Sequence, residues 1–161
     1  ESILMSMENK VTGAVAAAVI AMSTPFIAKW EGFEPVAYRD IVGVETVCYG
    51  ETRGVKLGDT YTKAQCEEML RKSVAEYYVG LQKYMTNPNI PIGVQASMLE
   101  LSYNVGIKAT GESTMMKLAN AGYYKSACKQ LDKWVRAGGG VVKGLVNRRA
   151  DSKVNLCLKG L

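Results

Sequence analysis

The chain has 161 residues, of which 48% are hydrophobic and 22% are charged, enough for one domain with a buried core. Its formal net charge is +5 and its pI is about 9.0, which favours an anionic partner: a bacterial envelope polymer, a nucleic acid or an acidic lipid. The sequence contains no histidine. This excludes histidine-dependent nucleophiles and histidine-containing zinc sites, so any general acid or base must be Asp, Glu, Lys, Tyr or Cys.

The four cysteines are Cys48, Cys66, Cys128 and Cys157, and no two of them form a C-x-x-C pair. We therefore expect no zinc site, and the sequence calls for no metal or other cofactor. In an oxidising compartment an even number of cysteines indicates two disulfides, whose connectivity the count leaves open. In the cytosol the same residues would be four reduced, half-buried thiols.

An uncharged run of 18 residues, Val11–Ala28, lies between Lys10 and Lys29. It just reaches the length that spans a membrane, but it is weakly hydrophobic because it is rich in small residues. Three interpretations stay open: a signal peptide, a marginal membrane anchor, or a buried helix of a soluble domain.

Two helices are predicted in this N-terminal region. The first covers about Glu8–Met22. Ser23 or Thr24 then caps a second, short helix with Pro25 at its first position, where proline is favoured.

The segment from Gly32 to Asp59 has a different composition, with glycines between short β-prone pieces such as Val44–Tyr49. This pattern predicts a small hairpin or a three-stranded sheet. The sequence Thr62–Gln65 then forms a capping box that opens a helix. Apolar residues recur at helical spacing as far as about Tyr84, after which asparagines and prolines end the helix.

The rest of the chain is predicted to be helical. The expected helices are Ile92–Val105, Ser113–Ala121, Tyr123–Arg136 and Val146–Leu158. We therefore predict an α+β fold in which a small β lobe is joined by a long helix to a larger helical lobe. A cleft between two such lobes is a natural ligand site.

Two carboxyl groups stand out as candidates for catalysis. Glu31 comes at the end of the short helix, beside Trp30 and Phe33, and there the helix dipole and the apolar neighbours favour the protonated form. Asp40 follows in a more polar setting and should stay ionised. Two carboxyl groups in opposed environments suit acid-catalysed cleavage of a glycosidic bond. The alternative is that both are solvated surface acids.

The surrounding motifs resemble those of a known family. A helix-end Glu followed by Gly, with Asp nine and Thr fifteen residues later, resembles the catalytic triad of phage lysozymes in glycoside hydrolase family 24. Further matching motifs are Ala37–Asp40, Val44–Gly50, Tyr61–Cys66, Ser102–Gly106, Gly138–Gly139 and Gly144–Arg149. The resemblance runs in unbroken order from Thr24 to the C-terminus, and it is strongest to the signal-arrest-release endolysins of lambdoid phages.

The resemblance implies a role for each site residue. Glu31 corresponds to the general acid, and Asp40 and Thr46 to the pair that holds and activates the attacking water. Arg148 corresponds to a basic residue that pairs with the catalytic Glu, and Tyr38 to a residue that lines the substrate cleft. The implied reaction is hydrolysis of the β-1,4 bond between N-acetylmuramic acid and N-acetylglucosamine in peptidoglycan. Direct attack by water would invert the anomeric centre, with the carboxyl groups about 6.5–9.5 Å apart.

Two other functions are compatible with parts of the sequence. A lytic transglycosylase also uses a Glu acid but needs no water-activating Asp. A non-catalytic wall-binding or membrane-active protein would act through its charge and apolar N-terminus. Nucleic-acid binding has only the pI in its favour, so we expect none, and we expect a monomer.

The resemblance also guides the cysteine pairing. Cys48 follows the β-lobe motif and Cys66 lies in the first turn of the long helix, which folds back beside the sheet. Cys128 and Cys157 lie in two C-terminal helices that should pack together. We therefore expect the disulfides Cys48–Cys66 and Cys128–Cys157.

Finally, the resemblance implies that Val11–Ala28 is a releasable tether to the inner membrane of the host, with the periplasm as destination. The alternative is a soluble N-terminal helix in an enzyme that stays in the host cytoplasm until a holin acts. We accordingly divide the chain into an apolar segment, 1–23, and a catalytic domain, 24–161. Within the latter we expect a β lobe at about 32–60, an inter-lobe helix at about 63–84 and a helical lobe at about 92–161.

Overall fold

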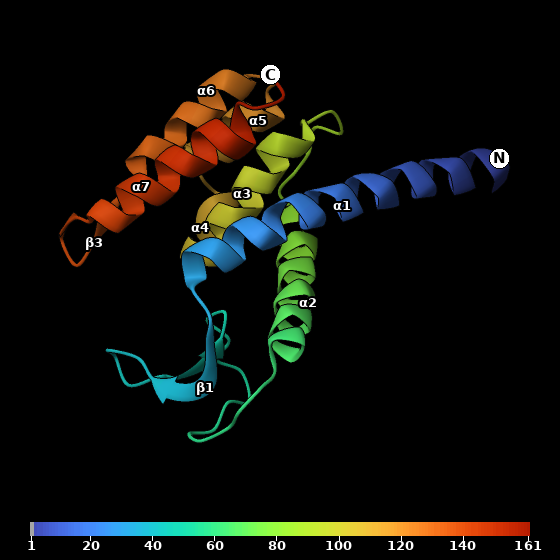
Figure 1. Cartoon of the computed structure of the whole chain (residues 1–161). Coiled ribbons are helices and arrows are strands. Elements are labelled where there is room, and N and C mark those ends of the chain that lie inside the picture. The colour runs from blue at the N-terminus through green and yellow to red at the C-terminus, as the bar shows by residue number, and fades with distance from the viewer. Residues whose placement is uncertain (1) are drawn as a thin grey trace.

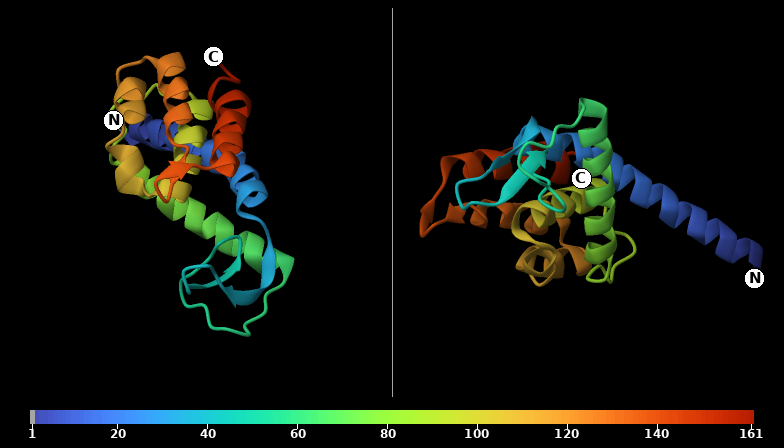
Figure 2. Two further views of the ribbon diagram at one scale, coloured as in Figure 1. Left: turned by 90° about the vertical axis from the view of Figure 1, so that its left-hand side faces the viewer. Right: turned by 90° about the horizontal axis from the view of Figure 1, so that it is seen from below.

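The computed structural model describes residues 2–161, with side chains from Gly13 onward; Glu1 and the side chains of residues 2–12, at the start of the expected segment 1–23, lie outside this description. The fold is α+β, as predicted, and has two lobes (Figure 1). The lobe with the small sheet lies at one end of helix α2 (Lys63–Gln82), and the helical lobe gathers around the other end (Figure 2).

Helix α1 (Ser2–Glu31) is continuous, so the predicted break before Pro25 is wrong. Ser23 and Thr24 do not cap a new helix. Their hydroxyls donate instead to carbonyl oxygens one turn back, at 2.7 Å each, and remain inside the helix. Pro25 removes one N–H from an otherwise intact ladder, and packing of the buried Val19 and Ile27 side chains compensates for that loss. Figure 1 shows the N-terminal part of α1 extending beyond the rest of the protein.

The β lobe is built on an antiparallel hairpin of β1 (Glu34–Arg39) and β2 (Glu45–Cys48), in which Tyr38 pairs with Thr46. Its turn is held by Asp40, whose Oδ1 accepts the backbone N–H groups of Val42 at 2.9 Å and Val44 at 2.8 Å. The hairpin prediction is therefore confirmed. Isolated bridges at Thr60 and Glu51 extend the sheet without adding a full third strand.

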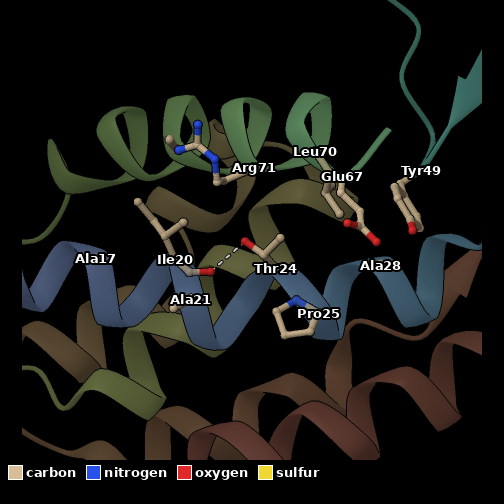
Figure 3. A pocket seen from close by; sticks show the side chains of 11 residues that line it. Ala17, Ile20, Ala21, Thr24, Pro25, Ala28, Tyr49, Glu67, Leu70 and Arg71 are labelled. Atoms are coloured by element: carbon tan, nitrogen blue, oxygen red, sulfur yellow. Dashed lines mark hydrogen bonds between the residues drawn. The ribbon is translucent and has the colours of Figure 1, made fainter. Parts of the chain in front are cut away.

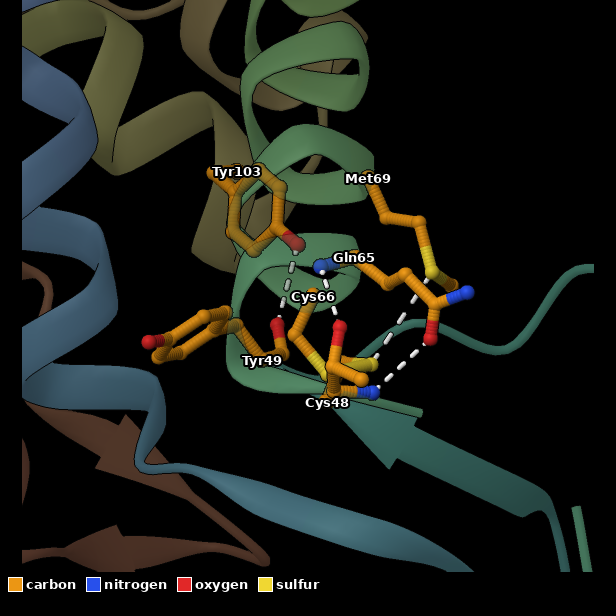
Figure 4. Close-up of a disulfide and its surroundings, with 7 residues drawn as sticks. Cys48, Tyr49, Gln65, Cys66, Met69 and Tyr103 are labelled. Carbon is orange, nitrogen blue, oxygen red and sulfur yellow. Dashed lines mark hydrogen bonds between the residues drawn. A yellow bond between two sulfur atoms is a disulfide. The ribbon is translucent and has the colours of Figure 1, made fainter. Parts of the chain in front are cut away.

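The predicted start of α2 is confirmed. Thr62 caps the helix and Gln65 completes the capping box, with hydrogen bonds of 3.1 and 2.8 Å (Figure 4). The expected Cys48–Cys66 disulfide ties the end of β2 to the first turn of α2, and the second expected disulfide, Cys128–Cys157, is present in the helical lobe.

Helix α3 (Ile92–Val105) has the predicted bounds and forms the centre of the helical lobe, where Val94 through Ser102 are all buried. Around it lie the short helices α4 (Ile107–Gly111), α5 (Thr114–Asn120) and α6 (Tyr124–Lys129), followed by a 3-10 turn (Gln130–Lys133). The sequence did not predict α4. The last helix, α7 (Lys143–Ser152), continues as a π-helical turn (Lys153–Cys157). Helix α7 therefore begins three residues before the predicted Val146.

The predicted helix Tyr123–Arg136 is too long. Its helical part ends at Lys133, and Arg136 belongs to a second small hairpin of β3 (Arg136–Ala137) and β4 (Gly140–Val141). Gly138 and Gly139 adopt φ values of 60° and 85°, which turn the chain back sharply. The glycine run thus does more than end a helix, because it makes the turn of a hairpin.

A cavity of about 660 Å³ lies between α1 and α2 (Figure 3). Small side chains on α1, including Ala17, Ala21 and Thr24, face Leu70 and Ala75 of α2 across it. Helix α1 packs against both of its neighbours, and more extensively against α3 of the helical lobe than against α2.

Candidate active site

Glu31 is the last residue of α1 and opens onto a cleft of about 480 Å³ between the two lobes. The cleft walls come from the β lobe, α2 and α3; they include Gly50, Glu51, Arg53, Ser73, Glu76, Tyr77, Tyr103 and Asn104. The Glu31 side chain is 21% exposed. Gly50 borders it so closely that a Cβ there would lie 3.2 Å from Glu31 Oε2, which makes the backbone of the β lobe one wall around the carboxyl group.

Arg148 of α7 contacts Glu31 from the protein side. Its Nη1 donates to Glu31 Oε1 at 3.1 Å, as the resemblance implied, while its Nε donates to Oε1 of Glu100 on α3. Arg148 is 6% exposed at its side chain and Glu100 is not exposed at all. One guanidinium group is therefore shared by two carboxyl groups.

Sequence reasoning missed Glu100. The signal available in the sequence was an acidic residue directly between two leucines, Leu99 and Leu101, in a predicted helix. Burial raises the pKa of Glu100, and the charges of Arg148 and Arg149 only partly offset that effect. Among the described residues, its Oε2 has no hydrogen-bond partner.

Arg149 and Tyr103 hold the cleft together from behind. Arg149 donates from Nε to the carbonyl oxygen of Trp134 at 2.9 Å and from Nη2 to Asn104 Oδ1. The Tyr103 hydroxyl donates to the carbonyl oxygen of Tyr49 at 3.1 Å and so links α3 to the β lobe (Figure 4). Burial, and after it the negative charge of Glu31, raises the pKa of Tyr103. These contacts join α7 and the β lobe to α3 behind the cleft.

Asp40, Thr46 and Tyr38 all lie on the hairpin of the β lobe, outside the lining of the cleft that contains Glu31. The Asp40 carboxylate accepts the two turn N–H groups described above. The Thr46 hydroxyl donates to the Val44 carbonyl oxygen at 3.0 Å, and Thr46 is buried, whereas Tyr38 is 41% exposed. Their roles in holding water and substrate stay predictions.

A second carboxylate in the cleft wall, Glu51, was also missed. Its Oε2 accepts the Ser73 hydroxyl at 2.8 Å, and its Oε1 accepts the backbone N–H of Arg53 at 3.1 Å. Burial would raise the pKa of Glu51, but these hydrogen bonds and the charge of Arg53 outweigh it, and the pKa lies below its usual value. Arg53 Nη1 continues to Glu76 at 2.8 Å, so the network connects the β lobe to α2.

Asp151 of α7 binds the C-terminal end of α1. Its Oδ2 accepts Lys29 Nζ at 2.9 Å and Trp30 Nε1 at 2.8 Å. Burial would raise the pKa of Asp151, but hydrogen bonds from Lys29, Asn155 and Trp30 outweigh it and lower the pKa. Glu31 is thus the residue that directly follows a fixed anchor.

Comparison with known proteins agrees with this geometry. The family model of phage lysozyme matches residues 28–152. The SAR-endolysin of Enterobacteria phage P21 is 36% identical over 162 aligned residues, covering 96% of this chain and 97% of that protein. The SAR-endolysin of Pseudomonas phage phiKMV is 36% identical over 159 residues, covering 95% of this chain and 94% of that protein. The solved endolysin from Escherichia coli O157:H7 phage FAHEc1 superposes with a TM-score of 0.78 at 27% identity, covering 87% of this chain and 92% of that one. The chain therefore belongs to the phage lysozyme family and is a glycoside hydrolase.

Proposed function

We propose that this enzyme lyses host cells by hydrolysing the β-1,4 bond between N-acetylmuramic acid and N-acetylglucosamine in peptidoglycan. The observation that carries the proposal is the position of Glu31, partly exposed in the inter-lobe cleft and paired on its other side with Arg148. A carboxyl group held in this way presents one side to a substrate and is oriented by the protein on the other.

In this mechanism Glu31 protonates the glycosidic oxygen as the leaving sugar departs. Asp40 and Thr46, on the β-lobe hairpin, hold a water molecule, and the Asp40 carboxylate takes its proton as the water attacks the anomeric carbon. Direct attack inverts the configuration of that carbon. Tyr38, which is exposed on the same hairpin, contacts the glycan, and Arg148 orients the acid. The net positive charge of +5 favours approach to an anionic wall.

The test is release of reducing sugar from purified peptidoglycan by the protein and by Glu31→Gln. Glu34→Gln is the matched control, since Glu34 is an exposed acid three residues away on β1. We expect release by the unchanged protein and the control, and none by Glu31→Gln. Products with 1,6-anhydro ends would instead identify a lytic transglycosylase. No release by any form would favour wall binding or membrane activity without catalysis.

We further propose that α1 tethers the enzyme to the inner membrane before its release into the periplasm, so that residues 1–23 act as the anchor and 24–161 as the catalytic domain. Within α1, Gly13–Glu31 is long and apolar enough to cross a membrane, with a mean hydropathy of 1.4, and 22% of this segment is buried in the fold. The P21 and phiKMV relatives are SAR-endolysins. An oxidising destination also suits two disulfides.

Fractionation of expressing cells over time tests the tether. We expect the protein first in the membrane fraction and later in the soluble periplasmic fraction. Replacing Ala17 and Ala21 with leucine should delay release, because each added methylene raises the cost of leaving lipid by about 0.8 kcal/mol. Recovery in the cytoplasm from the first time point would contradict the proposal.

A further inference from the structure

Glu100 is a charged group in a place that normally excludes charge. Its side chain is completely buried in the middle of α3, and removing a carboxylate from water is unfavourable unless cations compensate for it. The compensating cation is Arg148, which lies 48 residues further along the chain and whose Nε donates to Glu100. The arrangement brings a second carboxylate to the guanidinium that orients Glu31.

The charge of Arg148 is consequently divided. With Glu31 as its one partner, the guanidinium would strongly favour the ionised form of Glu31, which is the wrong form for a general acid. With Glu100 bound at Nε and Glu31 at Nη1, the guanidinium divides its charge between the two carboxyl groups and still holds Glu31 by a hydrogen bond of 3.1 Å. Orientation of the acid is thereby separated from its ionisation.

The other charged groups around Glu31 are engaged elsewhere. Arg149 on α7 is bound to Asn104 and Trp134, and Lys29 on α1 is bound to Asp151. The groups that remain are Tyr103 on α3, Tyr77 and Glu76 on α2, and Glu51 with Arg53 in the β lobe. Arg53 pairs with both Glu51 and Glu76, so among the side chains that the structure describes Arg148 is the cation in direct contact with the Glu31 carboxyl group.

We propose that Glu100 is a positioning residue that fixes Arg148 against Glu31 and, by sharing the charge of Arg148, limits how strongly the guanidinium favours a negative charge on Glu31. This inference rests on the proposed role of Glu31 as general acid. Glu100 itself contacts no substrate, because it has no exposed surface in the cleft.

The experiment is the pH dependence of kcat/KM for reducing-sugar release from purified peptidoglycan by the full chain and by Glu100→Gln. The glutamine keeps the shape and the oxygen that accepts Arg148 Nε but removes the negative charge. Arg148 then acts on Glu31 alone, so the alkaline limb of the profile should move to lower pH by about one unit. Glu112→Gln, at an exposed site following α4, is the matched control and should leave the limb in place.

Circular dichroism and thermal melting establish whether each variant is folded. If Glu100→Gln does not fold, Glu100→Asp replaces it: the charge remains but is drawn back from Arg148, and the limb should move in the same direction by less. A folded variant with an unmoved limb, or one moved to higher pH, would overturn the proposal. So would failure of both variants to fold, since Glu100 would then be a structural residue. Failure of the proposed function looks different, because Glu31→Gln would then retain activity.

Discussion

The two disulfides close loops of similar length, but only Cys48–Cys66 lies in the β lobe beside the cleft. Removing either one should therefore lower stability by a similar amount, whereas only removal of Cys48–Cys66 should lower activity. The perturbation is the double variant Cys48→Ala/Cys66→Ala, compared with Cys128→Ala/Cys157→Ala. Alanine is the suitable replacement because all four residues are almost completely buried and a serine hydroxyl would have to be desolvated.

The expected loss of stability follows from the loops. The bridges join residues separated by 18 and 29 positions, and closing such loops in the unfolded chain is worth about 3.2 and 3.6 kcal/mol respectively. Each is a large fraction of the roughly 5–15 kcal/mol that stabilises a typical domain. Urea denaturation of the oxidised proteins measures both losses, which should agree within about 1 kcal/mol.

Activity should distinguish the two variants. Cys48 has a φ of 62°, unusual for a residue with a side chain, and it lies two residues before Gly50, which borders Glu31. Freed from Cys66, this backbone can relax and shift the wall of the cleft. We expect a decrease in kcat/KM on the order of tenfold to a hundredfold for the first variant and little change for the second, measured where both are folded. Equal losses of activity, or a stability loss well under 1 kcal/mol for the first variant, would refute this reasoning.

Three further predictions concern the helical lobe. Arg148→Ala leaves two carboxyl groups without their cation and should lower the free energy of unfolding by about 3–5 kcal/mol, measured by urea denaturation at neutral pH. Gly93→Ala places a Cβ 2.3 Å from the Leu156 carbonyl oxygen and should cost about 2 kcal/mol or more, whereas Gly144→Ala, with no atom within 4 Å, should cost nothing; thermal melting compares them. Asp151→Asn should destabilise the protein at neutral pH. Hydrogen bonding lowers the pKa of Asp151 in the fold, so its contribution is present above the unfolded-state value of about 3.9 and is lost as the pH falls through the folded-state value. A difference from the unchanged protein that persists in strong acid would contradict that cause.

Much of the fold could be predicted because its signals are local. The Thr62 capping box and the bounds of Ile92–Val105 depend on residues within one or two helical turns. The break expected before Pro25 was wrong because Ser and Thr hydroxyls can serve either as caps or as internal partners, and packing decides between them. The β3–β4 hairpin was missed because a glycine run ends a helix and turns a hairpin equally well.

The candidate site divides in the same way. Glu31 and its pairing with Arg148 could be predicted from the motif resemblance, and the structure places the two in contact. Glu100, Glu51 and Asp151 could not be assigned, because each owes its environment to partners on other elements. The Glu100–Arg148 contact spans 48 residues of sequence, and a buried acid by itself does not reveal which arginine it meets.

The three-way contact at Arg148 also determines when the site can be assembled during synthesis of the chain. Glu31, Glu100 and Arg148 come from the first, third and seventh helices, so the acid is made early and its cation close to the end of the chain. The π-helical turn that follows α7 is itself linked to α6 by the Cys128–Cys157 disulfide. A nascent or truncated chain lacking α7 therefore carries Glu31 and Glu100 without the guanidinium group that both of them contact in the complete fold. The inter-lobe site is thus completed only when the last part of the chain has been added.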